Sequence, residues 1–351
     1  MKIAVIGNMR HFNLEEYSVK ALRNLGHEVK FLGFNDISRK KYSEFTRILS
    51  TRSAIFRKFS EPFWLNKINE EYLLSLMKFR PDIILSIKGE SILPKTLKHI
   101  SNELESKTAL WYPDDPRFFH SLVKYIAPEY DHIFTYSSKG IENYLSIGIE
   151  NPQRLSFGCD NEIHHRENWD NEPLKKALFV GTFTPKRFRI LRRLIKNGIE
   201  VDIAGKYWRN FLSSNVISNG AYGNQLVNLI QKYKVVINIH NNLNYGPNMR
   251  TFEVTGSGGL LLSDLSEDTD SFFINGKEAL FYQDINEMIS LIKEINSSDQ
   301  SLMEIAKNGY LKCHNSYPYT QIMKTFMKAM NEDLGRRNGI TPHHPGSLTQ
   351  C

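Results

Sequence analysis

Short apolar runs alternate along the chain with longer stretches in which apolar residues recur at helical spacing. Runs such as Ile83-Ile84-Leu85 are nearly continuous and β-branched, which is typical of strands buried on both faces of a sheet. The pattern predicts strands at 2–6, 28–33, 82–87, 107–112 and 132–136, and again at 177–181, 200–204, 234–239, 259–263 and 279–282. It predicts helices at 14–25, 62–78, 95–105, 138–146, 187–197, 223–232, 250–256, 285–296, 299–312 and 319–334.

This regular alternation predicts an α/β protein with parallel sheets and right-handed crossovers. The alternation restarts after a polar stretch, so we expect two Rossmann-like, doubly wound domains facing each other across a cleft. A length of 351 residues suits two domains better than one core. The expected parts are an N-terminal domain (1–158), a linker (159–173), a C-terminal domain (174–317), a helix that could cross back to the first domain (318–335) and a flexible tail (336–351).

Composition narrows the class of protein. The three cysteines are few and scattered, which favours a reducing, cytoplasmic setting over a disulfide framework. No apolar run reaches the roughly 18 residues of a membrane span, and the N-terminal strand lacks the apolar length of a signal peptide. The net charge of +7 favours anionic partners such as nucleotides, nucleic acid or acidic lipid. The densest cationic cluster, at 186–193, lies where a strand passes into a helix, which suits a local phosphate site.

The segment 248–264 carries the most specific chemical signal. Arg250 and Glu253 stand three residues apart and therefore share one face of the predicted helix. A nucleotide-sugar calls for such a pair, because a cation can bind the diphosphate and a carboxylate can bind the ribose hydroxyls. The alternative is an ordinary surface Arg–Glu pair on an amphipathic helix. Asn248 precedes this helix, and His240 ends the preceding buried strand in a polar cluster that could bind sugar hydroxyls or phosphate.

A second candidate for phosphate binding follows the strand at 177–181. Gly181 and Thr182 form a tight turn, and Lys186 and Arg187 open the next helix. Free N–H groups at a helix start attract anions, while positive side chains there are locally unfavourable. The presence of these cations therefore predicts an anionic ligand at the helix start. The alternative is a basic helix whose side chains are simply solvated.

Two adjacent carboxylates, Asp114 and Asp115, follow the strand at 107–112 between two prolines. The side chains of adjacent residues point in different directions, so we expect Asp114 and Asp115 to have different roles. One could cap the following helix, and the other could accept a proton from an attacking hydroxyl. Both could also be plain turn and cap residues. His11 follows the first strand in a loop expected to face the cleft, where it could touch substrate or remain an ordinary loop histidine.

The ordered set of these motifs resembles the GT-B glycosyltransferases, and most closely the CgeB-like family of spore-maturation proteins. The resemblance spans about residues 80–315 and rests on Pro81–Leu85 with Lys88-Gly89, Trp111 with Asp114-Asp115-Pro116, Tyr130–Thr135, Phe179–Thr182 with Pro185–Arg187, and Asn248–Glu253 with Gly258. It implies that the C-terminal domain holds a nucleotide-sugar and the N-terminal domain an acceptor. It implies further that Glu253 binds ribose and that Arg250, with Lys186 or Arg187, holds the diphosphate. Retaining families carry a glutamate eight residues before this one, where Tyr245 stands here.

The chain is also similar in two places to phage DNA β-glucosyltransferases. One is the strand-end pattern Asp115-Pro116-Arg117, whose aspartate serves there as the base, and the other is the Arg250 and Glu253 spacing. This similarity implies an inverting displacement with Asp115 as first choice for the base and Asp114 as second. Adjacent aspartates differ from the Asp-x-Asp metal motif of another glycosyltransferase class, so no catalytic metal is expected.

The sequence therefore predicts a metal-independent glycosyltransferase that moves a sugar from a nucleotide-diphosphate donor, expected to be UDP-linked, to a hydroxyl on a surface glycan, glycolipid or protein. One alternative keeps the fold and makes modified bases of DNA the acceptor; the acidic load of the first half disfavours nucleic acid. A second alternative is a non-catalytic nucleotide-sugar-binding protein, or a nucleotide-sugar epimerase.

Overall fold

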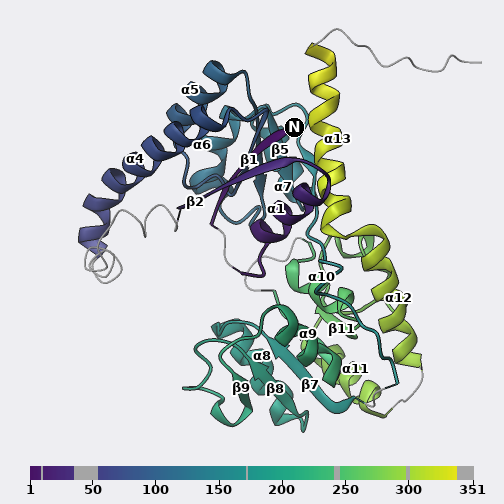
Figure 1. Cartoon of the computed structure of the whole chain (residues 1–351). Coiled ribbons are helices and arrows are strands. Elements are labelled where there is room, and N and C mark those ends of the chain that lie inside the picture. The colour runs from purple at the N-terminus through teal and green to yellow at the C-terminus, as the bar shows by residue number, and fades with distance from the viewer. Residues whose placement is uncertain (9–10, 35–53, 171–172, 241–245, 298–300, 338–351) are drawn as a thin grey trace, which may run out of the picture.

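The computed structural model describes residues 1–8, 11–34, 54–170, 173–240, 246–297 and 301–337. The expected tail beyond residue 337 and Tyr245 lie outside these ranges. Two separate six-stranded sheets, each all-parallel in its pairing, form the framework (Figure 1). The fold is therefore α/β with two doubly wound domains, as the alternation predicts.

The first sheet has the strand order β2-β1-β3-β4-β5-β6. Its strands are β1 (Lys2–Gly7), β2 (Glu28–Gly33), β3 (Ile83–Ile87), β4 (Lys107–Tyr112), β5 (His132–Thr135) and β6 (Gln153–Arg154). The α-helices that the structure describes in this half are α1 (Leu14–Asn24), α4 (Ala54–Phe79), α5 (Pro94–Leu104), α6 (Lys124–Ile126) and α7 (Ser138–Ser146).

The second sheet has the strand order β12-β11-β10-β7-β8-β9. Its strands are β7 (Leu174–Val180), β8 (Val201–Ala204), β9 (Val216–Ser218), β10 (Tyr233–Asn238), β11 (Leu261–Asp264) and β12 (Leu280–Tyr282). The helices that follow are α8 (Pro185–Lys196), α9 (Gly223–Lys232), α10 (Met249–Gly256), α11 (Ile285–Ser297), α12 (Ser301–Ser316) and α13 (Tyr319–Arg337).

Each predicted strand and helix has a counterpart, and the differences have simple causes. The sequence pattern missed β6 and β9, which are two and three residues long, lie at sheet edges and are only partly buried. It also began α4 at residue 62, whereas the helix begins at Ala54 and runs through Pro62, a residue normally disfavoured inside a helix. Among the described residues, no helix combines the length and apolarity needed to cross a membrane.

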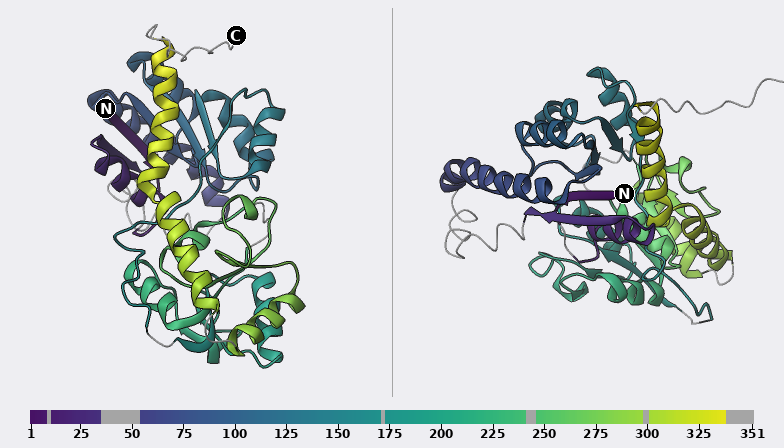
Figure 2. Two further views of the ribbon diagram at one scale, coloured as in Figure 1. Left: turned by 90° about the vertical axis from the view of Figure 1, so that its right-hand side faces the viewer. Right: turned by 45° about the horizontal axis from the view of Figure 1, so that its top comes forward.

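The last helix, α13, returns to the first domain and packs against α1 (Figure 2). Its Phe326 ring lies 5.3 Å from the ring of Phe134 in β5, and Tyr319 at its start stacks on Tyr17 of α1 at 5.1 Å. Phe326 and Met330 are fully buried in the same apolar cluster as Ile3 and Trp111 of the first sheet. The C-terminal helix therefore supplies part of the N-terminal core.

The chain passes between the two sheets twice, and the two passages are bonded to each other. The N–H of Cys159 donates to the carbonyl of Tyr317 at 2.9 Å, and the N–H of Tyr319 donates to the carbonyl of Cys159 at 2.9 Å. A Cβ at Gly158 would stand 2.3 Å from the Tyr317 carbonyl oxygen, so this close approach requires glycine.

Asp268 forms a further bridge between the domains. Its Oδ2 accepts from the N–H of Ser138 at 2.8 Å, and its Oδ1 accepts from the Ser138 hydroxyl at 2.6 Å. Arg154 lies 3.2 Å from the same carboxylate. Because Ser138 begins α7, a buried charge from the second domain caps a helix of the first.

Candidate active site

A cavity of about 880 Å³ lies where the carboxyl ends of strands from both sheets meet. In open parallel sheets this edge is the usual place for ligands. The lining includes Gly7 and Asn8 after β1, Lys88 after β3, and Asp114 and Asp115 after β4. From the second domain come Arg187, His240, Asn248 and Met249. Both domains thus contribute polar side chains to one cavity.

Asp115 lies on the wall supplied by the first domain and is almost fully buried, with 2% of its surface exposed. The Tyr144 hydroxyl donates to its Oδ2 at 2.9 Å. Burial raises the pKa of Asp115 to about 7, an effect that the hydroxyls of Thr135 and Tyr144 oppose and the nearby Asp114 charge reinforces. A carboxylate with such a pKa can take up a proton near neutral pH.

Asp114 has a different environment, as the sequence predicts for adjacent residues. Its side chain is partly exposed and forms an ion pair with Lys88. The two aspartates therefore divide into one buried carboxyl and one charge-paired carboxyl on the same cavity wall.

Glu15 and Glu90 also line this wall and were missed by the sequence analysis. Glu15 is buried in the first turn of α1, and its Oε1 accepts from the N–H of Asn8 at 3.4 Å. The Tyr112 hydroxyl donates to Glu90 at 3.3 Å. Both residues lie in segments that follow a strand, Glu15 after β1 and Glu90 after β3. These positions could have predicted that the two side chains reach the site, because the ends of β1 and β3 lie at the same edge of the sheet.

Arg187 approaches the cavity from the start of α8. Its Nε donates to the Ile239 carbonyl at 3.0 Å and its Nη1 to the Thr182 carbonyl at 3.0 Å. Burial lowers the pKa of Arg187, the charge of Arg250 lowers it further and the carboxylate of Asp264 opposes the shift. An anion bound in the cavity beside Arg187 would favour its charged form.

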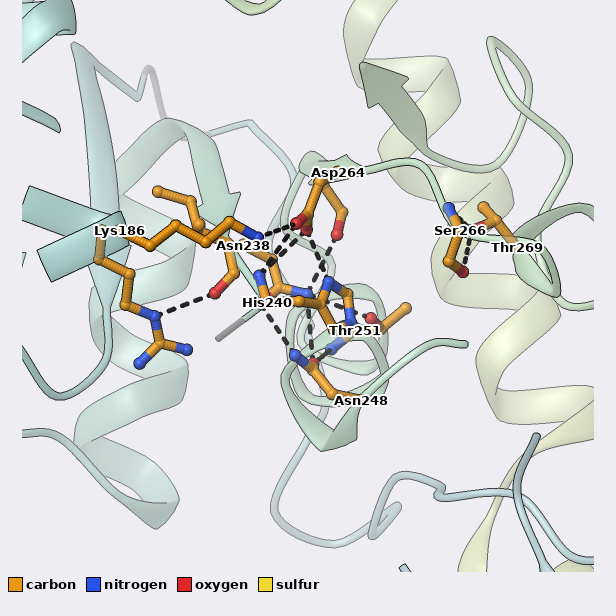
Figure 3. A network of polar contacts seen from close by, with 11 residues as sticks. Lys186, Asn238, His240, Asn248, Thr251, Asp264, Ser266 and Thr269 are labelled. Carbon is orange, nitrogen blue, oxygen red and sulfur yellow. Dashed lines mark hydrogen bonds and ion pairs between the residues drawn. The ribbon is translucent and has the colours of Figure 1, made fainter. Parts of the chain in front are cut away.

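His240 is held by Asp264, which lies at the end of the neighbouring strand β11 (Figure 3). Its Nδ1 lies 2.6 Å from Asp264 Oδ1, and its backbone N–H donates to the same carboxylate at 3.1 Å. Lys186 lies 3.4 Å from the other carboxylate oxygen. Burial raises the pKa of Asp264, but the bonds from His240 outweigh burial, so the net effect is a lowered pKa. His240 lines the cavity, and its buried Nε2 has no hydrogen-bond partner among the described residues.

The start of α10 completes this wall. The side chain of Asn248 accepts from the N–H of Thr251 at 3.2 Å and exchanges hydrogen bonds of 3.2 Å with Asn238 of β10. Asn248 and Met249 both line the cavity. The partial positive charge of a helix N-terminus therefore lies beside Arg187 and His240.

Other predicted site residues do not line this cavity. Arg250 pairs with Glu253 at 2.7 Å, as their shared face predicts, but Glu253 is buried toward Tyr17 and Tyr319. Burial raises the pKa of Glu253, and Arg250 opposes the shift. Their proposed ligand contacts stay predictions.

Gly181, Thr182, Lys186 and His11 are also absent from the lining. The carbonyl of Gly181 accepts from Trp208 Nε1 at 2.8 Å. Lys186 instead reaches Asp264, and the exposed His11 lies 3.4 Å from Glu16.

The proteins that this chain resembles include glycosyltransferases. Residues 187–328 match the family model described as glycosyl transferase-like, while no curated protein matches the chain. Among solved structures, HepE from Anabaena in complex with UDP and glucose is 11% identical, with a TM-score of 0.66 over 95% of this chain and 100% of that one. Sucrose-phosphate synthase from Thermosynechococcus elongatus is 12% identical, with a TM-score of 0.68 over 95% and 99%. A glycosyltransferase from Rickettsia africae is 9% identical, with a TM-score of 0.67 over 95% and 98%.

The chain therefore has the fold of the GT-B glycosyltransferases, and its residues 187–328 are similar to the glycosyl transferase-like family. The narrower resemblance to CgeB-like proteins and to phage DNA β-glucosyltransferases stays a prediction.

Proposed function

We propose that the enzyme transfers a sugar from a UDP-linked donor to an acceptor hydroxyl inside the interdomain cavity. The observation that carries this proposal is the opposition of two walls, one with Asp115 and one with Arg187, His240 and the start of α10. The bound UDP and glucose of the structurally similar HepE support the choice of donor. A cytoplasmic location is part of the proposal.

The two walls suit the two halves of a displacement. The acceptor oxygen forms a bond to the anomeric carbon while the bond from that carbon to the diphosphate oxygen breaks. Asp115 takes the acceptor's proton. Arg187, His240 and the N–H groups of α10 stabilise the negative charge that develops on the departing UDP. A single displacement of this kind inverts the anomeric centre, and these protein groups supply the charge stabilisation without a metal.

Arg250 and Glu253 extend the donor site in this proposal. Arg250 stands in the first turn of α10, whose N-cap Asn248 lines the cavity together with Arg187, so we expect the diphosphate to extend from Arg187 to Arg250. Glu253 would then exchange its bond to Arg250 for the ribose hydroxyls. We expect Glu253→Ala to weaken UDP binding by about 1–3 kcal/mol, the usual scale for a lost charged hydrogen bond. Unchanged affinity in calorimetry would remove Glu253 from the site.

The acceptor wall is polar and carries both signs of charge. Glu15, Glu90 and Asp114 supply carboxylates, and Lys88 and Arg117 supply cations. Hydroxyl-rich saccharides of a glycan, glycolipid or glycoprotein can use both as hydrogen-bond partners. The carboxylates disfavour the phosphates of a DNA acceptor.

The deciding experiment is a thermal-shift panel with UDP-, GDP-, dTDP- and CMP-sugars, because a ligand that binds the folded state raises the melting temperature. We expect UDP-sugars to give the largest shift and Arg187→Ala to abolish it. Arg193→Ala is the matched control, since Arg193 lies on α8 but bonds to Asn286 instead of lining the cavity. The absence of a shift with every nucleotide-sugar would contradict the proposal, and NMR of the product's anomeric proton tests inversion.

A further inference from the structure

Positive charge is concentrated in one part of the chain. Residues 182–252 contain eleven Lys and Arg against two Asp and Glu, so they carry a formal charge of +9. The whole chain carries +7, so the remaining residues sum to −2. No Asp or Glu occurs from 203 to 252. The donor site uses only a few of these cations, which leaves a surplus on the outside of the second domain.

Helix α8 displays much of this surplus. Arg189, Arg192 and Lys196 are exposed and spaced three and four residues apart, so they form one stripe along the helix. The Arg192 guanidinium lies over the ring of Phe188 at 5.9 Å. The stripe contains no acidic residue that would neutralise it.

The segment 205–212 brings exposed aromatic rings to the same helix. Phe211 is 50% exposed, and its ring lies 5.5 Å from Phe188 of α8 and stacks on Phe183 at 4.1 Å. The segment is fixed from below by Trp208, which is fully buried and donates to the Gly181 carbonyl at 2.8 Å. The arrangement is therefore preformed.

Tyr207 is the most exposed of these rings, at 73%. Its φ of +68° is an unfavourable conformation for a residue with a bulky side chain. The neighbouring cations Lys206 and Arg209 are exposed as well. Packing within the described residues does not explain this unfavourable backbone conformation, because it leaves the Tyr207 ring exposed to water.

We propose that the aromatic-basic patch, formed by Phe188, Arg189, Arg192, Tyr207, Arg209 and Phe211, docks the enzyme on an anionic lipid bilayer. Aromatic rings favour the boundary between headgroups and acyl chains, and Arg and Lys bind anionic headgroups. Nucleic acid is the weaker fit, because Phe183 and Phe211 already stack on each other and their facing surfaces are closed to bases. α8 also carries Arg187 at its start, so docking would hold the donor site beside the membrane surface.

The test is co-sedimentation of the full chain with vesicles of phosphatidylcholine, with or without phosphatidylglycerol. We expect binding only when phosphatidylglycerol is present, and weaker binding at high salt. Arg189→Gln combined with Arg192→Gln should lower the partition coefficient at least about tenfold, since each cation near the surface contributes about a fivefold factor. Phe211→Ala should lower it as well without changing the charge.

The matched control carries Lys293→Gln with Leu311→Ala, which remove an exposed cation and an exposed apolar side chain elsewhere on the second half. This control should bind vesicles like the wild type. Equal binding to neutral vesicles, or equal loss in the control, would overturn the proposal. The proposal would also be overturned if the wild type did not bind vesicles but was retained by a column of single-stranded oligonucleotide, and if the patch variants lost that retention. UDP binding should be the same in all variants, so this result is independent of the proposed donor site.

Discussion

Asp115 combines deep burial with a place on the cavity wall, and this combination sets its chemistry. With a pKa of about 7, the side chain is protonated at acid pH and becomes a base as the pH rises through neutrality. We expect the transfer rate to rise with pH up to about 7 and then level off. Asp115→Asn should lower the rate by about 10²–10⁴-fold while UDP affinity is kept. Asp114→Asn is the comparison, and a fully active Asp115→Asn enzyme would assign the base elsewhere.

The same raised pKa has an opposite consequence for stability. Between the ordinary pKa of 3.8 and about 7, the folded state binds a proton that the unfolded state has released. Stability from this group is therefore present at low pH and is lost as the pH rises toward 7. Denaturant unfolding across this range should show a shallower fall in Asp115→Asn than in the wild type.

The role of His240 can be tested by donor binding alone, without the acceptor substrate. Asp264 holds Nδ1, and the other groups facing the ring region are Lys186 and Arg187 of α8. The Nε2 atom is left to bond to a donor ligand in the cavity. We expect His240→Ala to weaken UDP binding by about 1–3 kcal/mol in calorimetry, the usual scale for a lost hydrogen bond to a charged group.

His11→Ala is the control, because it removes an exposed ring outside the cavity, and it should leave UDP affinity unchanged. Equal UDP affinity in the wild type and in His240→Ala would refute the role of His240 without touching the rest of the donor site.

At the scale of elements, the N-cap residue of α10 has two roles. Asn248 caps the helix and also lines the cavity. Asn248→Ala should lower the free energy of unfolding by about 1 kcal/mol and also weaken UDP binding. Ser137→Ala removes the cap of α7 and should cost similar stability with UDP affinity unchanged. Equal UDP affinity in both variants would show that the start of α10 does not bind the donor.

The sequence predicted most elements because buried parallel strands leave long apolar runs, as in β3 and β4. It predicted that Arg250 and Glu253 meet, because helix geometry alone fixes that contact. Which way their shared face points depends on tertiary packing, so the contacts of Glu253 with the surroundings of Tyr17 could not be foreseen. Asp264 was missed as a site residue for the same reason, since its partner lies 24 positions away.

At the scale of the whole molecule, Asp268 ties the two domains together. Asp268→Ala removes the bonds to Ser138 and the ion pair with Arg154. We expect the free energy of unfolding in urea to fall by about 1.5–3 kcal/mol, the scale for hydrogen bonds to a charged group. Asp270→Ala, an exposed change in the same short turn, should stay within about 0.5 kcal/mol. An equal loss of stability in the two variants would mean that the contacts of Asp268 with the first domain do not stabilise the protein.

The return of α13 to the first domain couples two distant parts of the chain during synthesis. Phe326 and Met330 leave the ribosome long after Ile3, Trp111 and Phe134, yet all five share one apolar cluster. The first sheet must therefore wait with part of its core uncovered until α13 has been translated. A fragment ending at residue 158 would keep every strand of that sheet and still expose apolar surface, so the N-terminal half is a structural unit only together with α13.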